Sequence, residues 1–195
     1  MGWEAGRPLP APGGALVEID PLPADAAARD EVKTYLRIED DGDDALVDRL
    51  VAVAIAHGEA FTGRLWLIRA VEETVPACGE WRRLGCTPVR SITSVAALPG
   101  DGGDPVTLAV DAYAIDIDAA GDGWVRTIDA GSAARLRLSY QAGLAAGWAS
   151  LPEPLRQGAV RLASHFYARR DDPDEGAPPA AAAALWRPWR RMRVL

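Results

Sequence analysis

The sequence contains very few cysteines, histidines and lysines. Cys78 and Cys86 are the only cysteines, His57 and His165 the only histidines, and Lys33 the only lysine. Two cysteines are too few for a disulfide scaffold, and with so few histidines the sequence offers no convincing zinc-ligand set. We therefore expect two reduced thiols, no bound metal and no cofactor.

Long hydrophobic runs are also missing. No stretch approaches the ~20 apolar residues that a membrane-spanning helix needs, and the N-terminus lacks a basic segment followed by an apolar run. The formal net charge is −7 at pH 7. Because nucleic-acid binding depends mainly on Lys and Arg neutralising phosphates, this charge argues against phosphate binding as the main task. We expect no contact with a membrane.

Catalytic motifs are absent as well. The segment His57-Gly-Glu lacks the second histidine of a zinc-protease helix, and no GxSxG is present. A general base needs a convergent partner, so His57 and His165 are better interpreted as packed, interface or solvated residues. Acidic clusters at 39–44 and 101–104 lack the ligand spacing of a calcium loop and are interpreted as helix caps and turns. We expect no catalytic residue, and no enzyme.

What the sequence does contain is a mixture of two periodicities. Apolar residues at helical spacing predict helices near 24–36, 44–62 and 153–170. A carboxylate of Asp43 or Asp44 is expected to cap the second helix, and Gly63 to end it. On that helix one apolar face is predicted to hold Leu46, Leu50, Val53, His57 and Phe61, and Val47, Val51 and Ile55 are predicted to widen the apolar arc.

Between the second and third helices the pattern changes to short β-branched and aromatic segments. About five antiparallel strands are expected from about 64 to 141, and 135–140 alternates so that Leu136, Leu138 and Tyr140 share one face. The fold class is therefore α+β: a small helical bundle with an antiparallel β-rich insertion. The predicted organisation is an extended N-terminal arm over 1–23, a body over 24–172, and a C-terminal linker and tail over 173–195.

The tail is the least ordinary segment, because tryptophans and arginines alternate in it. These residues could stack on bases and hold phosphates, yet Trp and Arg are also enriched among hot spots of protein interfaces. On an acidic chain we favour protein docking. The residues concerned are Leu185, Trp186, Arg187, Trp189, Arg190 and Arg191.

The order of segments resembles the head-tail connector (adaptor) family of long-tailed bacteriophages and gene transfer agents. The matching motifs are Lys33-Leu36-Arg37-Ile38, Glu59-Thr62-Gly63-Arg64, Pro88-Val89-Ser91-Ile92, Tyr140-Ala142-Gly143 and the helix from Pro152 to Arg170. The resemblance spans about 31–190. It departs from the family at Arg169-Arg170-Asp171, where Arg-Glu is usual, and residues 1–23 have no counterpart.

The resemblance implies a structural protein made in a bacterial cytoplasm and placed at the head-tail junction of a phage-like particle. There it would form a ring of about twelve copies that binds the portal protein above and a tail-side stopper or terminator protein below. DNA would pass through the ring without specific binding, which an acidic channel wall favours.

The resemblance also implies roles for particular residues. The tail residues named above, 185–187 and 189–191, would dock on the portal, and the face of the third helix opposite its apolar stripe would contact the next subunit. Those contact residues are Arg161, His165 and Arg169. The alternative that stays open is a nucleic-acid-binding regulator that uses the same basic-aromatic tail.

Overall fold

The computed structural model describes residues 9–10, 16–100, 102–169 and 179–191, and the chain divides into two compact units. A helical unit consists of Leu22–Leu67 and Leu144–Leu195, and a β unit consists of Met1–Pro21 and Ile68–Gly143. Each unit therefore combines segments that are far apart in the sequence. The predicted linker at 173–178 and most of the predicted N-terminal arm lie outside the described residues.

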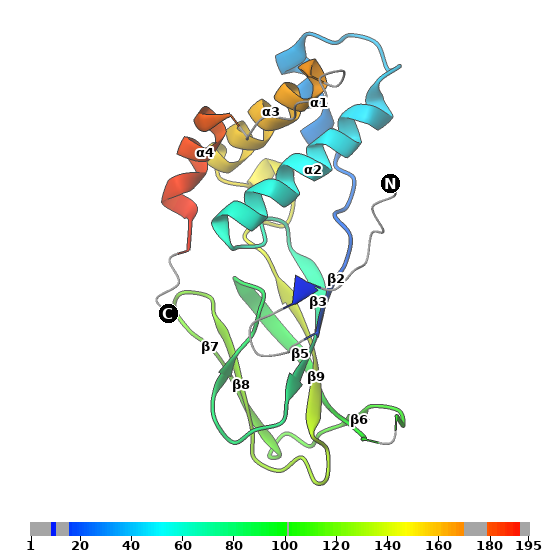
Figure 1. The fold of residues 1–195 in the computed structure, drawn as a ribbon, viewed down its shortest axis with the longest axis vertical. Helices are drawn as coiled ribbons and strands as arrows, with labels where there is room; N and C mark the ends of the chain where they lie inside the picture. The colour runs from blue at the N-terminus through cyan, green and yellow to red at the C-terminus, as the bar shows by residue number, and fades with distance from the viewer. Residues whose placement is uncertain (1–8, 11–15, 101, 170–178, 192–195) are drawn as a thin grey trace. The chain divides into compact units, whose positions relative to one another are not determined.

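The helical unit follows the predicted helices closely (Figure 1). Its elements are α1 (Ala26–Leu36), α2 (Asp44–Thr62), the short 3-10 helix η1 (Trp148–Ser150), α3 (Glu153–Ala168), α4 (Ala180–Trp186) and a second 3-10 turn, η2 (Arg187–Trp189). The prediction of an α+β fold with helices near 24–36, 44–62 and 153–170 is confirmed. Pro152 is the N-cap residue of helix α3 and Pro154 lies in its first turn, where proline is tolerated because its missing N–H would have no partner.

The ends of α2 show one correct and one wrong prediction. Gly63 ends the helix in the left-handed conformation with φ of 68°, and its N–H donates to the Glu59 carbonyl. Asp43 is the N-cap residue, but its side chain makes no capping hydrogen bond. Its carboxylate instead accepts a hydrogen bond from the hydroxyl of Tyr167 on α3. A tertiary contact has replaced the expected local one.

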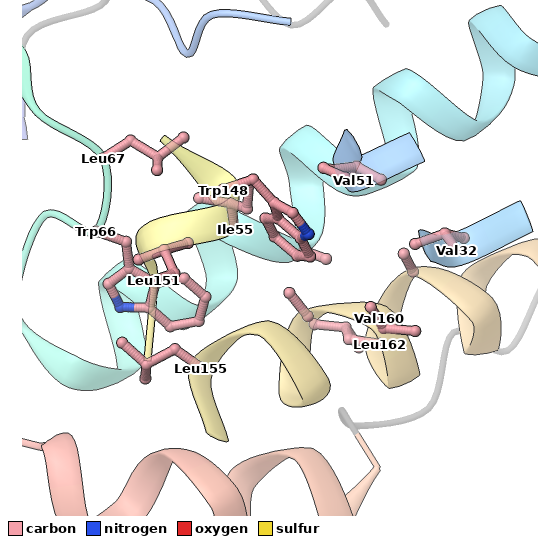
Figure 2. Packing of buried hydrophobic residues seen from close by; sticks show 14 of the residues in the cluster. Val32, Val51, Ile55, Trp66, Leu67, Trp148, Leu151, Leu155, Val160 and Leu162 are labelled. Carbon is pink, nitrogen blue, oxygen red and sulfur yellow. The ribbon is translucent and has the colours of Figure 1, made fainter. Parts of the chain in front are cut away.

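A cluster of aliphatic and tryptophan side chains forms the core of the helical unit (Figure 2). Trp66 and Trp148 are among its largest fully buried side chains. The Trp66 indole lies against Gly58 of α2, where an added Cβ would approach its ring to 2.0 Å. Its Nε1 donates to the Thr62 hydroxyl at 3.0 Å, so the buried N–H is satisfied.

The buried face of α2 lies on one side of the predicted apolar arc. It is formed by Val47, Val51, Ala54, Ile55, Gly58 and Thr62. Of these, Val47, Val51 and Ile55 were predicted to widen the arc, and the predicted Leu50 and Phe61 pack against the core as partly buried residues. Val53 and His57 are exposed, although the apolar spacing placed them on the packed face. Since both series recur at helical spacing, sequence alone could not decide which of them faces the core.

The β unit contains two antiparallel sheets. The larger sheet has the order β1-β2-β3-β9-β5-β6 and the smaller one the order β4-β8-β7. The strands are β1 (Leu9–Pro10), β2 (Leu16–Ile19), β3 (Arg69–Pro76), β4 (Arg82–Arg83), β5 (Val89–Leu98), β6 (Val106–Thr107), β7 (Tyr113–Ile117), β8 (Gly123–Thr127) and β9 (Arg135–Ala142). The five longer strands after residue 64 correspond to the predicted set, and the two-residue strands β4 and β6 were not predicted.

Strand β9 lies in the middle of the larger sheet, between β3 and β5. Its alternation is as predicted: Leu136, Leu138 and Tyr140 are buried, and the residues between them are partly or fully exposed. On the far side of β3, β2 pairs through Leu16–Ile19. Residues 16–19 of the predicted N-terminal arm therefore form a further strand of this sheet.

Glu73 on β3 is a buried acid at the centre of a hydrogen-bonded group in the β unit. Only 2% of the residue is exposed. Its Oε2 accepts from the Tyr140 hydroxyl at 2.6 Å and from the Gly85 N–H at 2.9 Å. The Tyr140 oxygen in turn accepts from the Cys86 N–H at 3.2 Å. The group ties the 85–86 segment to strands β3 and β9.

Burial raises the pKa of Glu73, while the bonds from Tyr140 and Gly85 and the charge of Arg82 partly oppose the rise. Because the pKa is higher in the folded than in the unfolded chain, the stabilising contribution is complete at low pH. It is lost as pH rises through the raised value.

We therefore expect hydrogen-exchange protection of the β9 amides to fall as pH is raised above the ordinary titration range of a glutamate, after correction for intrinsic exchange. Glu73→Gln should remove this pH dependence. Glu72→Gln, at the exposed neighbouring position, should keep it. An unchanged pH dependence in Glu73→Gln would show that another group is responsible.

Candidate interaction site

The C-terminal tail folds back onto the helical unit. Ala182 and Trp186 of α4 are buried, with 0% and 1% of their surface exposed. The Trp186 ring meets Trp66 edge-on at a centroid distance of 5.3 Å and Phe61 at 6.0 Å. Its Nε1 donates to the Leu155 carbonyl at 3.3 Å. Trp186 is therefore a core residue.

Gly158 of α3 makes this packing possible. A Cβ at this position would lie 2.1 Å from Nε1 of Trp186, far inside van der Waals contact. Glycine is disfavoured in the middle of a helix because of its backbone entropy. Its presence in α3 is explained by the close approach of the Trp186 indole.

After α4, the chain runs along the C-terminal end of α2. The N–H of Arg191 donates to the Thr62 carbonyl at 2.9 Å, and the Arg190 guanidinium lies 5.7 Å above the ring of Phe61. Cations suit this position because a helix C-terminus carries partial negative charge. Between the tail and α2 is an open groove of about 860 Å³, lined by Ala60, Phe61, Gly63, Arg187, Pro188, Arg190 and Arg191.

The structure thus divides the predicted portal-docking residues into groups. Trp186 is inside the core, where it is not available to a partner while α4 stays packed. Leu185 and Trp189 are half-buried against that core. Arg187 and Arg190 are exposed, and Arg191 is half-buried. The sequence did not indicate the opposite wall of the groove, because that wall comes from the end of α2.

Two of the predicted subunit-contact residues, Arg161 and His165, lie one turn apart on the same side of α3, and Arg169 follows the helix as its C-cap residue. Arg161 and Arg169 are exposed and His165 is half-buried. The His165 ring lies 6.2 Å from that of Phe166. His57 on α2 lies 5.8 Å from the same ring. The two histidines therefore contact one phenylalanine.

Within the described ranges, no three His, Cys, Asp or Glu side chains are grouped so that they could hold a metal ion. Neither Cys78 nor Cys86 is part of a disulfide. Among the described helices none is long and apolar enough to cross a membrane.

Three solved structures resemble this chain along most of its length. A chain from the neck of an empty gene transfer agent (GTA) particle, computed with C6 symmetry, is 24% identical with a TM-score of 0.74, over 92% of this chain and 97% of that one. A chain from the virion of a native GTA particle is 25% identical with a TM-score of 0.69, over 90% and 92%. A chain from the neck of a native GTA particle, computed with C12 symmetry, is 23% identical with a TM-score of 0.64, over 91% and 97%.

No protein-family model matches the sequence, and no curated protein matches it significantly. The agreement with the solved structures covers nearly the whole of each chain, so both the helical and the β unit are shared. The chain has the fold of these particle components.

Proposed function

We propose that this chain belongs to the head-tail connector family of long-tailed bacteriophages and gene transfer agents, and that it is a structural ring protein of a particle neck. The observation that carries the proposal is the shared fold over 92% of this chain and 97% of a GTA neck chain. The sequence motifs shared with connectors, which run from Lys33 to Arg170, point independently to the same family.

In this role the chain would form a closed ring at the head-tail junction and continue the DNA channel. The C6 and C12 symmetries of the similar necks support a homo-oligomeric ring. The portal and a tail-side stopper or terminator are its proposed partners, and its proposed task requires no catalysis. The net charge of −7 would let DNA pass without adhering.

The alternative of a nucleic-acid-binding regulator is weakened by the packing of the tail. Such a regulator would need the tail aromatics to stack on bases, but Trp186 is 1% exposed and surrounded by its own chain. The three structures compared above come from particle necks and a virion, which does not support a regulator.

We further propose that the tail docks on the portal chiefly through Trp189, with Leu185 beside it. Interface energy is concentrated in a few aromatic side chains with apolar surroundings. Trp189 is half-buried in the free chain, so docking would complete its burial. The proposal includes an N-terminal arm over 1–23, a body over 24–172 and a C-terminal linker and docking tail over 173–195.

If Trp189 contacts the portal, Trp189→Ala should lower the affinity of the ring for purified portal by at least about tenfold. Each site then loses ~1.4 kcal/mol of binding free energy, and the effect on the whole ring is larger because all copies bind together. Co-sedimentation of the chain with portal measures this. Trp81→Ala, at a tryptophan that is 46% exposed in the β unit, is the matched control. Equal portal binding by both variants, with unchanged circular dichroism, would contradict the docking role.

A further inference from the structure

The groove at the end of α2 is basic. Among the described residues, Arg187 and Arg190 form no ion pair with a carboxylate, and both are exposed. Arg190 is steadied by the ring of Phe61. A planar guanidinium in a groove of about 860 Å³ is suited to receive carboxylates in paired hydrogen bonds.

The opposite end of the same helix is acidic. Asp41 in the turn before α2 and Asp44 at the start of α2 form ion pairs with Lys33 at 2.9 and 2.6 Å, and Asp44 also pairs with Arg29 at 3.3 Å. Glu39 and Asp40 are exposed and make no ion pair with a described residue. The Asp40 side chain accepts the Gly42 N–H, which shapes the turn and leaves its second oxygen for another donor.

Both features belong to the helical unit, and α2 separates them (Figure 1). A helix of 19 residues spans about 28 Å at 1.5 Å per residue, so one chain cannot join its own turn to its own groove. A closed ring requires contacts between two different surfaces of neighbouring copies. Complementary charges at the two ends of one helix meet that requirement.

We propose that the arginine groove of one copy receives Glu39 and Asp40 of the next copy in the ring. The inference rests on the proposed function, because it needs a ring. Arg187 and Arg190 then serve the contact between copies, while Trp189 and Leu185 remain for the portal. The contact also holds each tail in place against its own α2.

A contact between copies explains these exposed charges better than the dipole of α2 or DNA binding does. The dipole favours acids before the helix and cations after it, but that effect requires neither a groove nor an exposed Arg187. DNA phosphates could also bind arginines, yet a chain of net charge −7 repels them on average. The acidic turn is the carboxylate source that every copy in the ring supplies.

Charge reversal tests the contact with the full-length chain. One variant carries Arg187→Glu and Arg190→Glu, a second carries Glu39→Arg and Asp40→Arg, and a third combines all four changes. The control carries Arg49→Glu and Arg135→Glu, two exposed positions that change net charge by the same amount as the first variant. Sedimentation velocity over a range of concentrations measures self-association, and circular dichroism verifies the fold.

We expect wild type and control to associate as concentration rises, and each two-site variant alone to associate about 100-fold more weakly, because like charges would meet. An equimolar mixture of the two variants should regain association to within about tenfold of wild type, since every contact then joins opposite charges. Alternating copies can close a ring of even number, as in C6 and C12 necks. The four-site variant should associate alone.

Three results would overturn the proposal: undiminished association of either two-site variant, failure of the mixture to recover, or a wild type that stays monomeric up to its solubility limit. If the groove served the portal or DNA, the first variant would lose that partner and the second variant would not restore it. None of these outcomes decides whether the chain is in the particle neck, which is judged by imaging particles.

Discussion

Replacing Trp186 with alanine is expected to lower the free energy of unfolding of the helical unit by about 3–5 kcal/mol, the range for truncating a buried tryptophan. The indole is 1% exposed and packs against Trp66 and Phe61. Its removal leaves a cavity beside Gly158, which has no side chain to fill it. The Leu155 carbonyl also loses a hydrogen bond.

Urea unfolding followed by circular dichroism measures this loss. Trp189→Ala is the matched control, because Trp189 is only half-buried. This variant should lose less than half as much unfolding free energy as Trp186→Ala. Equal losses for both variants would contradict the assignment of Trp186 to the core. A chain that is truncated so that it ends before residue 180 would lose part of the core, Ala182 and Trp186, together with the tail.

Gly58→Val is expected to destabilise the same unit by about 3 kcal/mol, at the upper end of the usual cost of overpacking. The first atom of the new side chain would lie 2.0 Å from the Trp66 ring. That ring is 0% exposed and is held by the bond from its Nε1 to Thr62. Neither the ring nor the α2 backbone can move away without breaking other contacts.

Ala56→Val is the matched control for helix propensity, because it places the same β-branched side chain at an exposed position of α2. Its cost should be below about 0.7 kcal/mol. Thermal unfolding of the two variants gives the comparison. A Gly58→Val variant as stable as Ala56→Val would contradict the packing of Trp66 on α2.

Helices and strands could be predicted where the residues that determine them are close together in the sequence. The ends of α1, α2 and α3 follow from apolar spacing and from Gly63 and Pro152, and the alternation in β9 identifies its buried face. The overall order of these segments was specific enough to indicate a connector.

Long-range packing was not predictable from the same signals. A carboxylate of Asp43 or Asp44 was expected to cap α2, but that of Asp43 accepts a hydrogen bond from Tyr167, 124 residues away. His57 shares an apolar spacing with Leu50 and Val53, and only the arrangement of α2 and α3 leaves it exposed. In the tail, composition identified the tryptophans and arginines as unusual. Which of them is buried depends on the pairing of Trp186 with Gly158 across helices.

A glycine in the middle of each of two helices was the signal that could have revealed this pairing. Gly58 and Gly158 both interrupt otherwise helix-favouring sequences, and such glycines are retained where a neighbour approaches closely. The tryptophans that pack against these glycines, Trp66 on Gly58 and Trp186 on Gly158, contact each other. The core of the helical unit could therefore have been anticipated, whereas the basic groove beside it required the structure.

The most direct test of the connector role is a cryo-electron microscopy reconstruction of the neck of particles from cells that encode this chain. We expect a ring of copies at the head-tail junction into which the helical and β units fit, with density joining the tail to the portal. A neck resolved to side-chain detail that contains no density for this chain would contradict the connector role.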